Sequence, residues 1–169
     1  MIRQRLPQQL CGAALEIFRE LKIIRSDARL IVVGDGALSQ QMHKKIREFE
    51  IEDSVKMLGS RSDVNELLQA ADVFLLPSKF EGLGIVLIEA QAAGLPTFTS
   101  AGVVPDDAKI SELLEFVPLI ESPKEWASRI AKTSNVNREN MKECISQAGY
   151  DNYENAKKLE RTYLSCIAE

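Results

Sequence analysis

Two glutamates separated by seven residues stand out in the segment KFEGLGIVLIEAQAAGLP, residues 79–96. Glu81 lies in a glycine-containing stretch that is typical of a loop, whereas Glu89 lies within an apolar run that is typical of a buried helix. A carboxylate can accept hydrogen bonds from two adjacent hydroxyl groups, which a ribose diol or a hexose offers. Because burying Glu89 without such partners would cost on the order of several kcal/mol, we expect it to face a polar crevice.

The loop around Glu81 also has the features of an anion site. Gly82 and Gly84 carry no Cβ atom, so a ligand can approach their backbone closely. The helix expected from about Gly84 to Ala93 would point free N–H groups and the positive end of its dipole at this loop. A diphosphate suits both features. With a helical rise of about 1.5 Å per residue, Glu81 and Glu89 would lie on the order of 12 Å apart, about the reach of a sugar nucleotide.

Each of these features also has an ordinary explanation. Glu81 taken alone reads as a solvated loop carboxylate, and Glu89 reads as an acid on a helix surface. The sequence Gly34-Asp35-Gly36 borders a predicted strand, but it lacks the third glycine of a dinucleotide fingerprint, which disfavours a dinucleotide-dependent oxidoreductase. The combination of motifs, rather than any one of them, favours a site for a sugar nucleotide.

Composition narrows the class of protein further. The chain has 169 residues, of which 45% are hydrophobic and 27% are charged, as expected for one globular domain. A formal net charge of −4 disfavours nucleic acid as a partner. Three cysteines without metal-ligand spacing and a single histidine disfavour a metal site and favour a reduced, cytoplasmic protein. We see no membrane-spanning run and no secretory signal in the first ten residues.

Helices and strands are expected to alternate through most of the chain. Short apolar runs predict strands at 30–33, 55–58, 73–76, 97–100 and 116–120. Amphipathic patterns predict helices at 12–22, 39–50, 63–71, 84–93 and 123–130. This alternation with short connections predicts an α/β fold with a Rossmann-like, doubly wound parallel sheet and helices on both faces.

Local signals refine this plan at three places. Asp63 and Glu66 have the spacing of a capping-box variant, so Asp63 is expected to cap its helix. Ser122-Pro123 is a strong helix start. A charged helical segment at about 138–169 is expected to pack back on the sheet, within one domain that covers residues 1–169.

Taken in order, the motifs resemble the donor-binding, C-terminal half of retaining glycosyltransferases of the GT-B fold, family 4 or group 1. The likeness rests on LIVVGDG, VKMLGSRSDVNELLQAADV and ADVFLLPSKFEGLGIVLIEAQAAGLP, and it runs from about Gly12 to Ser100. The later segments ESPKEWASRI and AGYDNYENAKKLERTYL are similar to members that build capsular or exopolysaccharides.

The resemblance implies roles for the two glutamates and the residues between them. Glu81 matches the glutamate that contacts hydroxyls of the transferred sugar, and it is the candidate catalytic residue. Glu89 matches the glutamate that binds the ribose. Backbone groups of Gly82, Leu83 and Gly84 would meet the distal phosphate and the sugar.

The resemblance also implies which residues bind the nucleotide part of the donor. Gly34 and Gly36 match the glycine turn that borders the nucleotide, and Ser60 and Arg61 match the loop whose backbone reads the base. The donor would be a nucleotide-diphosphate sugar, with a UDP-sugar favoured, and neither a cofactor nor a metal is expected. The acceptor would be a carbohydrate or a lipid-linked glycan, and the full enzyme could associate peripherally with a membrane.

The chain departs from the family pattern at its amino end. The family has a first strand, an arginine and, about five residues later, a lysine that clamp the leaving diphosphate. Here Arg5 falls at the arginine position, Leu10 replaces the lysine, and the first strand is degenerate or missing. The N-terminal acceptor domain is also missing. We therefore expect donor binding with little turnover by the chain alone, and a noncatalytic remnant or partner-binding subunit is the alternative.

Overall fold

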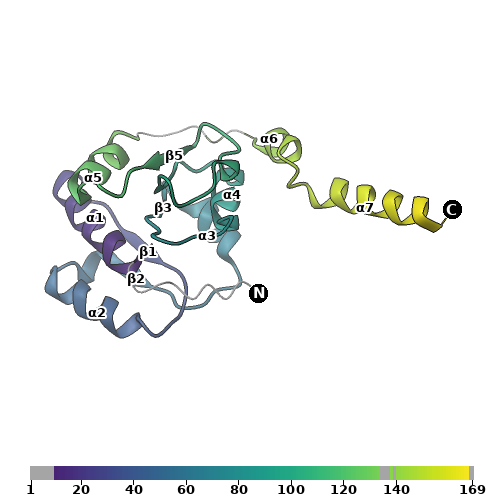
Figure 1. The fold of residues 1–169 in the computed structure, drawn as a ribbon. Coiled ribbons are helices and arrows are strands. Elements are labelled where there is room, and N and C mark those ends of the chain that lie inside the picture. The colour runs from purple at the N-terminus through teal and green to yellow at the C-terminus, as the bar shows by residue number, and fades with distance from the viewer. Residues whose placement is uncertain (1–9, 134–137, 139, 168–169) are drawn as a thin grey trace.

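The computed structural model describes residues 10–133, 138 and 140–167. Its helices are α1 (Leu10–Ile24), α2 (Ser39–Glu48), α3 (Val64–Ala70), α4 (Ile85–Ala92), α5 (Pro123–Lys132), α6 (Lys142–Gln147) and α7 (Asn152–Ile167). Its strands are β1 (Leu30–Val32), β2 (Val55–Met57), β3 (Phe74–Leu76), β4 (Thr97–Ser100) and β5 (Leu114–Val117). Helices and strands alternate along the first part of the chain, as the sequence predicts (Figure 1).

Every strand pair in the described part of the chain is parallel. β1 pairs with β2 in one sheet, and β3, β4 and β5 pair in that order in another. The prediction of an α/β fold with parallel strands is thus confirmed, although the described strands form two sheets. No described strand precedes α1, so β1 and β3 each keep one edge without a described strand partner. The degenerate or missing first strand stays a prediction, because residues 1–9, including Arg5, lie outside the described residues.

α1 connects the packing of the two sheets. Its residues Leu15 and Phe18 are buried in the core that covers β1 and β2. Ile17, on the same helix, is buried in the core that joins β3 and β4 to Trp126 of α5. Leu21 packs against both clusters. One amphipathic helix therefore holds both sheets through apolar contacts.

α4 is buried on most of its circumference, because its apolar residues pack into two separate apolar clusters. Leu87 and Ile88 pack against Leu76 and Leu114, and Ala90 belongs to a second cluster. Gln91 is fully buried, but its amide is satisfied. Its Nε2 donates to the carbonyl oxygens of Leu87 and Ala108, and its Oε1 accepts from backbone N–H groups of the following loop. These bonds fix the position of α4 against the sheet.

Two predicted local features are wrong. Asp63 makes no side-chain hydrogen bond to the start of α3, because its carboxylate pairs with Arg61 instead. The last strand spans Leu114–Val117 rather than residues 116–120, since Pro118 cannot donate to a strand ladder and Ile120 is 95% exposed. The start of α5 is as predicted, with Ser122 as the cap and Pro123 at the first helical position, and Ser122 and Glu125 form a capping box.

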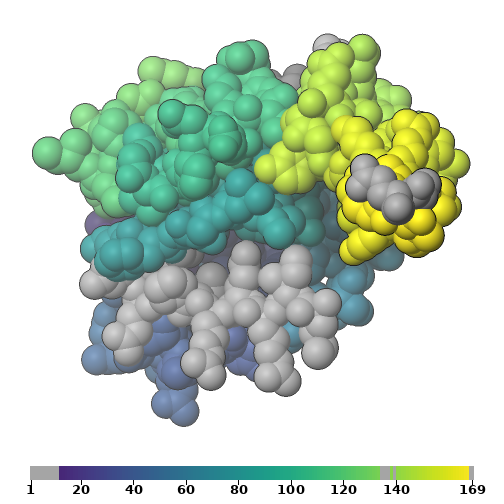
Figure 2. Space-filling model, turned by 45° about the vertical axis from the view of Figure 1, so that its right-hand side comes forward, coloured from purple at the N-terminus to yellow at the C-terminus, as the bar shows by residue number. Residues whose placement is uncertain are grey.

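The C-terminal segment also departs from the prediction. It contains α6 and α7, separated at Gly149, whose φ of 81° ends the first helix. α7 extends away from the rest of the molecule in Figure 1 and is seen as a separate lobe on the right in Figure 2, and none of its residues is buried, so it does not pack back on the sheet. Its apolar residues are between 55% and 80% exposed, namely Tyr153, Leu159, Tyr163, Leu164 and Ile167.

Candidate functional site

The segment between β3 and α4 turns sharply at the carboxyl end of its strand. Ser78 is fully buried, and its backbone N–H donates to the carbonyl oxygen of Leu76 at 2.9 Å. Gly84 then adopts a left-handed conformation with φ of 64° at the start of α4. A Cβ atom there would lie only 2.9 Å from Cδ1 of Leu87, which is itself buried. The turn into the helix therefore requires glycine at position 84 on two independent grounds.

The carboxylate of Glu81 is held by its own loop. Its Oε1 accepts the backbone N–H of Gly82 at 3.2 Å, and its Oε2 accepts the hydroxyl of Ser78 at 3.4 Å. The side chain is half-buried, whereas Gly82 and Leu83 are exposed. Glu81 thus lies at the surface of the loop in an orientation that two donors of the loop set.

The amino end of α4 is open to a ligand. Gly84 occupies the cap position and provides no side-chain acceptor for the first turn. The backbone N–H groups of Ile85 and Val86 have no acceptor within the helix, because the first turn always leaves such donors free. Together with the helix dipole, these donors favour an anion next to Gly82, Leu83 and Gly84. The helix start thus follows the loop as the sequence predicts, and anion binding at this place stays a prediction.

Glu89 lies on the outward face of α4, four residues after Ile85 and three before Ala92. It is half-buried, and burial raises the pKa of its carboxyl group above the ordinary value of 4.5. Within residues 10–133, 138 and 140–167, its side chain has neither a hydrogen bond nor an ion pair. A partly desolvated carboxylate without a partner is destabilising, which favours a ligand contact over a chance surface position.

The helix-based estimate of the distance between the two glutamates needs correction. α4 begins at Ile85, so the chain from Glu81 to Gly84 is loop, and only the last four steps to Glu89 follow the helical rise. The two carboxylates still lie before and within the same helix. Glu81 precedes its first turn, and Glu89 lies one turn further along.

The predicted nucleotide-end residues form a second group. The backbone N–H of Gly34 donates to the carbonyl oxygen of Gly59 at 2.8 Å, which joins the turns that follow β1 and β2. Gly36 donates its N–H to the Asp35 carboxylate at 2.9 Å and, like Ser60, is exposed.

Arg61 is tied to Asp63 by two side-chain hydrogen bonds, one of them 2.7 Å long. This pair raises the pKa of Arg61 and lowers the pKa of Asp63. The Arg61 guanidinium is therefore hydrogen-bonded within its own loop. The backbone of this loop is then the group most available to contact a nucleobase.

The structure brings the predicted residues together in two groups rather than one. Gly34, Gly36, Ser60 and Arg61 follow β1 and β2, whereas Glu81 to Glu89 follow β3. Both groups lie after the carboxyl ends of parallel strands, where ligands bind in sheets of this type. No hydrogen bond between described residues joins the two groups. Arg5, the predicted contact to the diphosphate, lies outside the described residues.

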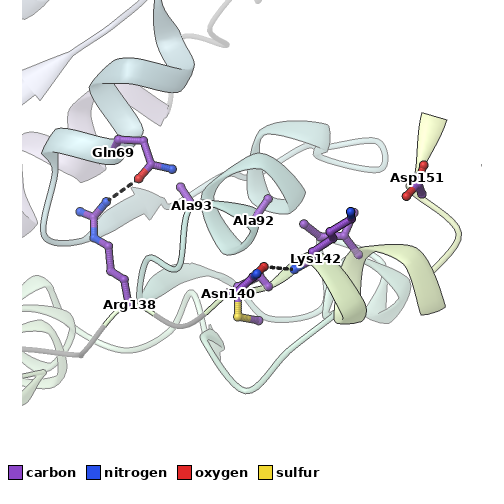
Figure 3. Close-up of a pocket in the computed structure, with 9 residues that line it drawn as sticks. Gln69, Ala92, Ala93, Arg138, Asn140, Lys142 and Asp151 are labelled. Carbon is purple, nitrogen blue, oxygen red and sulfur yellow. Dashed lines mark hydrogen bonds between the residues drawn. The ribbon is translucent and has the colours of Figure 1, made fainter. Parts of the chain in front are cut away.

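A cavity of about 280 Å³ lies at the opposite end of α4, between α3, α4 and α6 (Figure 3). Arg138 borders it and donates to Oε1 of Gln69 at 3.3 Å and to the carbonyl oxygen of Ala71. Sequence reasoning did not identify this cavity, because Arg138 and Gln69 are 69 positions apart in the chain. Its lining residues are Gln69, Ala92, Ala93, Arg138, Asn140, Met141, Lys142, Ile145 and Asp151.

Comparison with known proteins identifies the family. Residues 8–150 match the family model described as glycosyl transferases group 1. The chain belongs to this family. The family resemblance inferred from the motifs is confirmed, because the match includes β1 to β5 together with both groups of predicted site residues.

Two relatives show how this group 1 glycosyltransferase chain relates to longer members. The Bacillus subtilis protein EpsF, a glycosyltransferase by provisional assignment, is 35% identical over 139 residues, which is 80% of this chain and 36% of EpsF. The crystal structure of WaaG, a glycosyltransferase involved in lipopolysaccharide biosynthesis, matches with a TM-score of 0.66 and 25% identity, over 79% of this chain and 38% of WaaG. The chain thus spans well under half the length of either.

A third comparison concerns the fold. The crystal structure of Anabaena HepE in complex with UDP-glucose matches with a TM-score of 0.70 and 23% identity, over 96% of this chain and 47% of HepE. This likeness supports the expected fold, a parallel α/β domain that corresponds to one half of a GT-B glycosyltransferase.

Two further features of the group 1 domain concern metal binding and membrane insertion. Among the described residues, no group of three or more His, Cys, Asp or Glu side chains is arranged to hold a metal ion. None of the described helices has both the length and the apolar character that a membrane span requires.

Proposed function

We propose that this chain is the donor-binding domain of a retaining group 1 glycosyltransferase, and that it binds a nucleotide-diphosphate sugar at the amino end of α4. The observation that carries the proposal is the pair of carboxylates on either side of that helix end. Glu81 is oriented by its loop, and Glu89 is half-buried without a described partner. A diphosphate between them would accept hydrogen bonds from the free N–H groups of the first turn.

Each group has a specific role in this proposal. Glu81 accepts hydrogen bonds from hydroxyls of the transferred sugar, and it is the candidate catalytic residue of the chain. Glu89 accepts the ribose hydroxyls, which would offset the cost of its partial burial. The backbone of Gly82, Leu83 and Gly84 contacts the distal phosphate and the sugar. No metal is needed, because helix N–H groups and Arg5 supply the positive charge.

The nucleotide end follows β1 and β2. The glycine turn at Gly34 and Gly36 borders the nucleoside, and backbone groups of Ser60 and Arg61 read the base. Uracil is favoured, since HepE, a structure with the same fold, was solved with UDP-glucose. In the transfer step, the bond between the anomeric carbon and the diphosphate oxygen breaks on the departure of the nucleoside diphosphate. A bond to the acceptor oxygen forms with retention, and the acceptor proton is released.

The acceptor side is proposed to lie outside this chain. The chain spans 36% of EpsF and 38% of WaaG, so an acceptor domain of comparable size is expected to complete the cleft. A polysaccharide or glycolipid acceptor is supported by WaaG, which takes part in lipopolysaccharide biosynthesis. Such an enzyme would work in the cytoplasm, with peripheral contact to the membrane that carries its acceptor.

A noncatalytic domain is the second candidate. Leu10 stands where the family has the lysine of the diphosphate clamp, and loss of that charge favours a remnant or a partner-binding subunit. The exposed apolar side of α7 fits a partner as well. Restoring an acceptor half from a group 1 relative distinguishes these candidates. Sugar transfer by the reconstituted protein supports the enzyme, whereas nucleotide binding without transfer supports the subunit.

Titration calorimetry of the chain with UDP and with UDP-glucose tests the proposed function. We expect weak but measurable binding, with a tenfold or larger loss for Glu89→Gln. Glu52→Gln is the matched control, because Glu52 is an exposed carboxylate that precedes β2, whereas the proposed site follows the carboxyl ends of the strands. No heat of binding at millimolar UDP would contradict the proposal.

A further inference from the structure

We propose that Ser78 is a positioning residue, whose buried hydroxyl orients the Glu81 carboxylate for the donor sugar. The inference rests on the proposed function of Glu81. Ser78 itself is 0% exposed, so a substrate cannot reach its hydroxyl. Any effect of Ser78 on the sugar must therefore pass through a neighbour, and its side-chain partner is Oε2 of Glu81.

Three features of the loop define the orientation of Glu81. The Ser78 hydroxyl donates to Oε2 at 3.4 Å, which is longer than the roughly 2.8 Å usual for such a bond. The Gly82 N–H donates to the other oxygen at 3.2 Å. On a third side, a Cβ placed on Gly84 would lie 3.4 Å from Cγ of Glu81, so the side chain lies against this glycine. Two directed donors and one close surface restrict the rotamers of Glu81.

This arrangement leaves acceptor capacity for a ligand. Each carboxylate oxygen offers two lone-pair directions, and each accepts one hydrogen bond from the loop. One direction on each oxygen remains, which is the pattern that two adjacent sugar hydroxyls need. Without the Ser78 hydroxyl, Oε2 would lose its fixed direction, and the carboxylate would have to be ordered by the sugar at an entropic cost.

The test separates sugar recognition from nucleotide recognition. Calorimetry with UDP and with UDP-glucose gives the ratio of the two affinities, which measures the contribution of the sugar. We expect Ser78→Ala to leave UDP affinity within twofold and to reduce this ratio by threefold or more. Ser78→Cys should reduce the ratio similarly, because a thiol is a poor donor of nearly the same size, and it serves if the alanine variant folds poorly.

Ser100→Ala is the matched control. Ser100 is also a fully buried serine at the carboxyl end of a neighbouring strand, but its hydroxyl has no partner among the described residues. Its removal should change neither affinity. A double variant with Glu81→Gln should lose no more of the ratio than Glu81→Gln alone, since the two residues act as one unit.

The outcomes are distinguishable. An unchanged ratio in Ser78→Ala overturns the inference, and so does an equal loss of affinity for UDP and UDP-glucose, which would mean that Ser78 supports the whole loop. A wild-type chain that binds UDP without preferring UDP-glucose overturns the inference but leaves nucleotide binding intact. A wild-type chain that binds neither ligand contradicts the proposed function itself.

Discussion

The two ends of α4 differ in the features by which a binding site is recognised, namely a cavity, backbone donors and charged side chains. The carboxyl end borders a cavity of about 280 Å³, lined by the cations Arg138 and Lys142 (Figure 3). The amino end has free N–H donors and a left-handed glycine, with Glu81 before the helix and Glu89 in its second turn. In the proposed function a second domain closes the site, so the half on this chain can be an open surface. Cavity volume is therefore a poor guide here, and chemistry is the better one.

Glycine substitutions at the two ends should give the largest difference. Gly84 and Gly94 both have positive φ, 64° and 71°, so alanine is strained at either position by about 1 kcal/mol. At position 84 the new Cβ would also lie 2.9 Å from buried Leu87, whereas at position 94 the nearest atom is Cβ of exposed Arg138 at 3.3 Å. We expect Gly84→Ala to lower the free energy of unfolding by about 2 to 3 kcal/mol.

Chemical denaturation measures both variants. Gly94→Ala should cost about 1 kcal/mol less than Gly84→Ala, because exposed Arg138 can move and Leu87 cannot. Equal costs would show that the packing at the amino end is looser than the structure indicates.

Arg138→Ala tests whether the carboxyl end is a structural contact. The guanidinium donates to Gln69 and to the carbonyl of Ala71, which ties the segment before α6 to α3. Because these bonds are exposed, their loss should lower the free energy of unfolding by only about 0.5 to 1 kcal/mol. Affinity for UDP should stay within twofold in calorimetry, and a larger loss would make this end part of the binding site.

Glu89→Gln should have a small effect on stability that depends on pH. Burial raises the pKa of Glu89, so the folded state favours the protonated form, and stability falls as the pH rises through this raised value. At neutral pH the substitution should raise the free energy of unfolding by about a few tenths of a kcal/mol, since the group is only partly buried and solvent screens its charge.

Thermal unfolding at pH 7 and below pH 4 checks the sign for Glu89. The gain should disappear below the ordinary carboxyl value of 4.5, where both states are protonated. A variant that is more stable at pH 7 but binds UDP less tightly would show that Glu89 contributes to ligand binding at a cost in stability. A variant that is less stable at pH 7 would reveal a structural partner of Glu89.

Lys142→Glu should have the smallest effect. The exposed ammonium group borders the cavity, and no described ion pair involves it. Reversal of its charge should leave UDP affinity within twofold, because the proposed anion site lies at the other end of the helix. A tenfold loss in calorimetry would move the site to the cavity.

The sequence predicts the parallel α/β fold and the type of most elements, because apolar runs and glycine turns are local signals. Prediction from the sequence fails where several groups compete for one side chain or where the extent of the core decides the outcome. Asp63 has the spacing of a cap, but Arg61 offers its carboxylate a charged partner two residues away. Residues 116–120 form an apolar run that predicts a strand, but the buried positions end at Val117, and the strand spans only Leu114–Val117.

The same limit applies to the site and to α7. The two carboxylates and the helix start are visible in the sequence, since they depend on spacing within one segment. The Ser78 contact and the cavity are not, because they depend on side-chain direction and on residues far apart in the chain. The apolar stripe of α7 predicts a buried face, but the pattern does not say what covers it.

Amide chemical shifts of the ¹⁵N-labelled chain during titration with UDP-glucose test the central claim most directly. The account predicts that the largest changes fall on residues 82–86 and on Glu89, with smaller changes at Gly34 and Ser60. The amides of Ala92, Ala93, Lys142 and Ile145, which line the cavity at the other end of α4, should not move. Changes confined to that cavity, or no changes at millimolar ligand, would contradict the account.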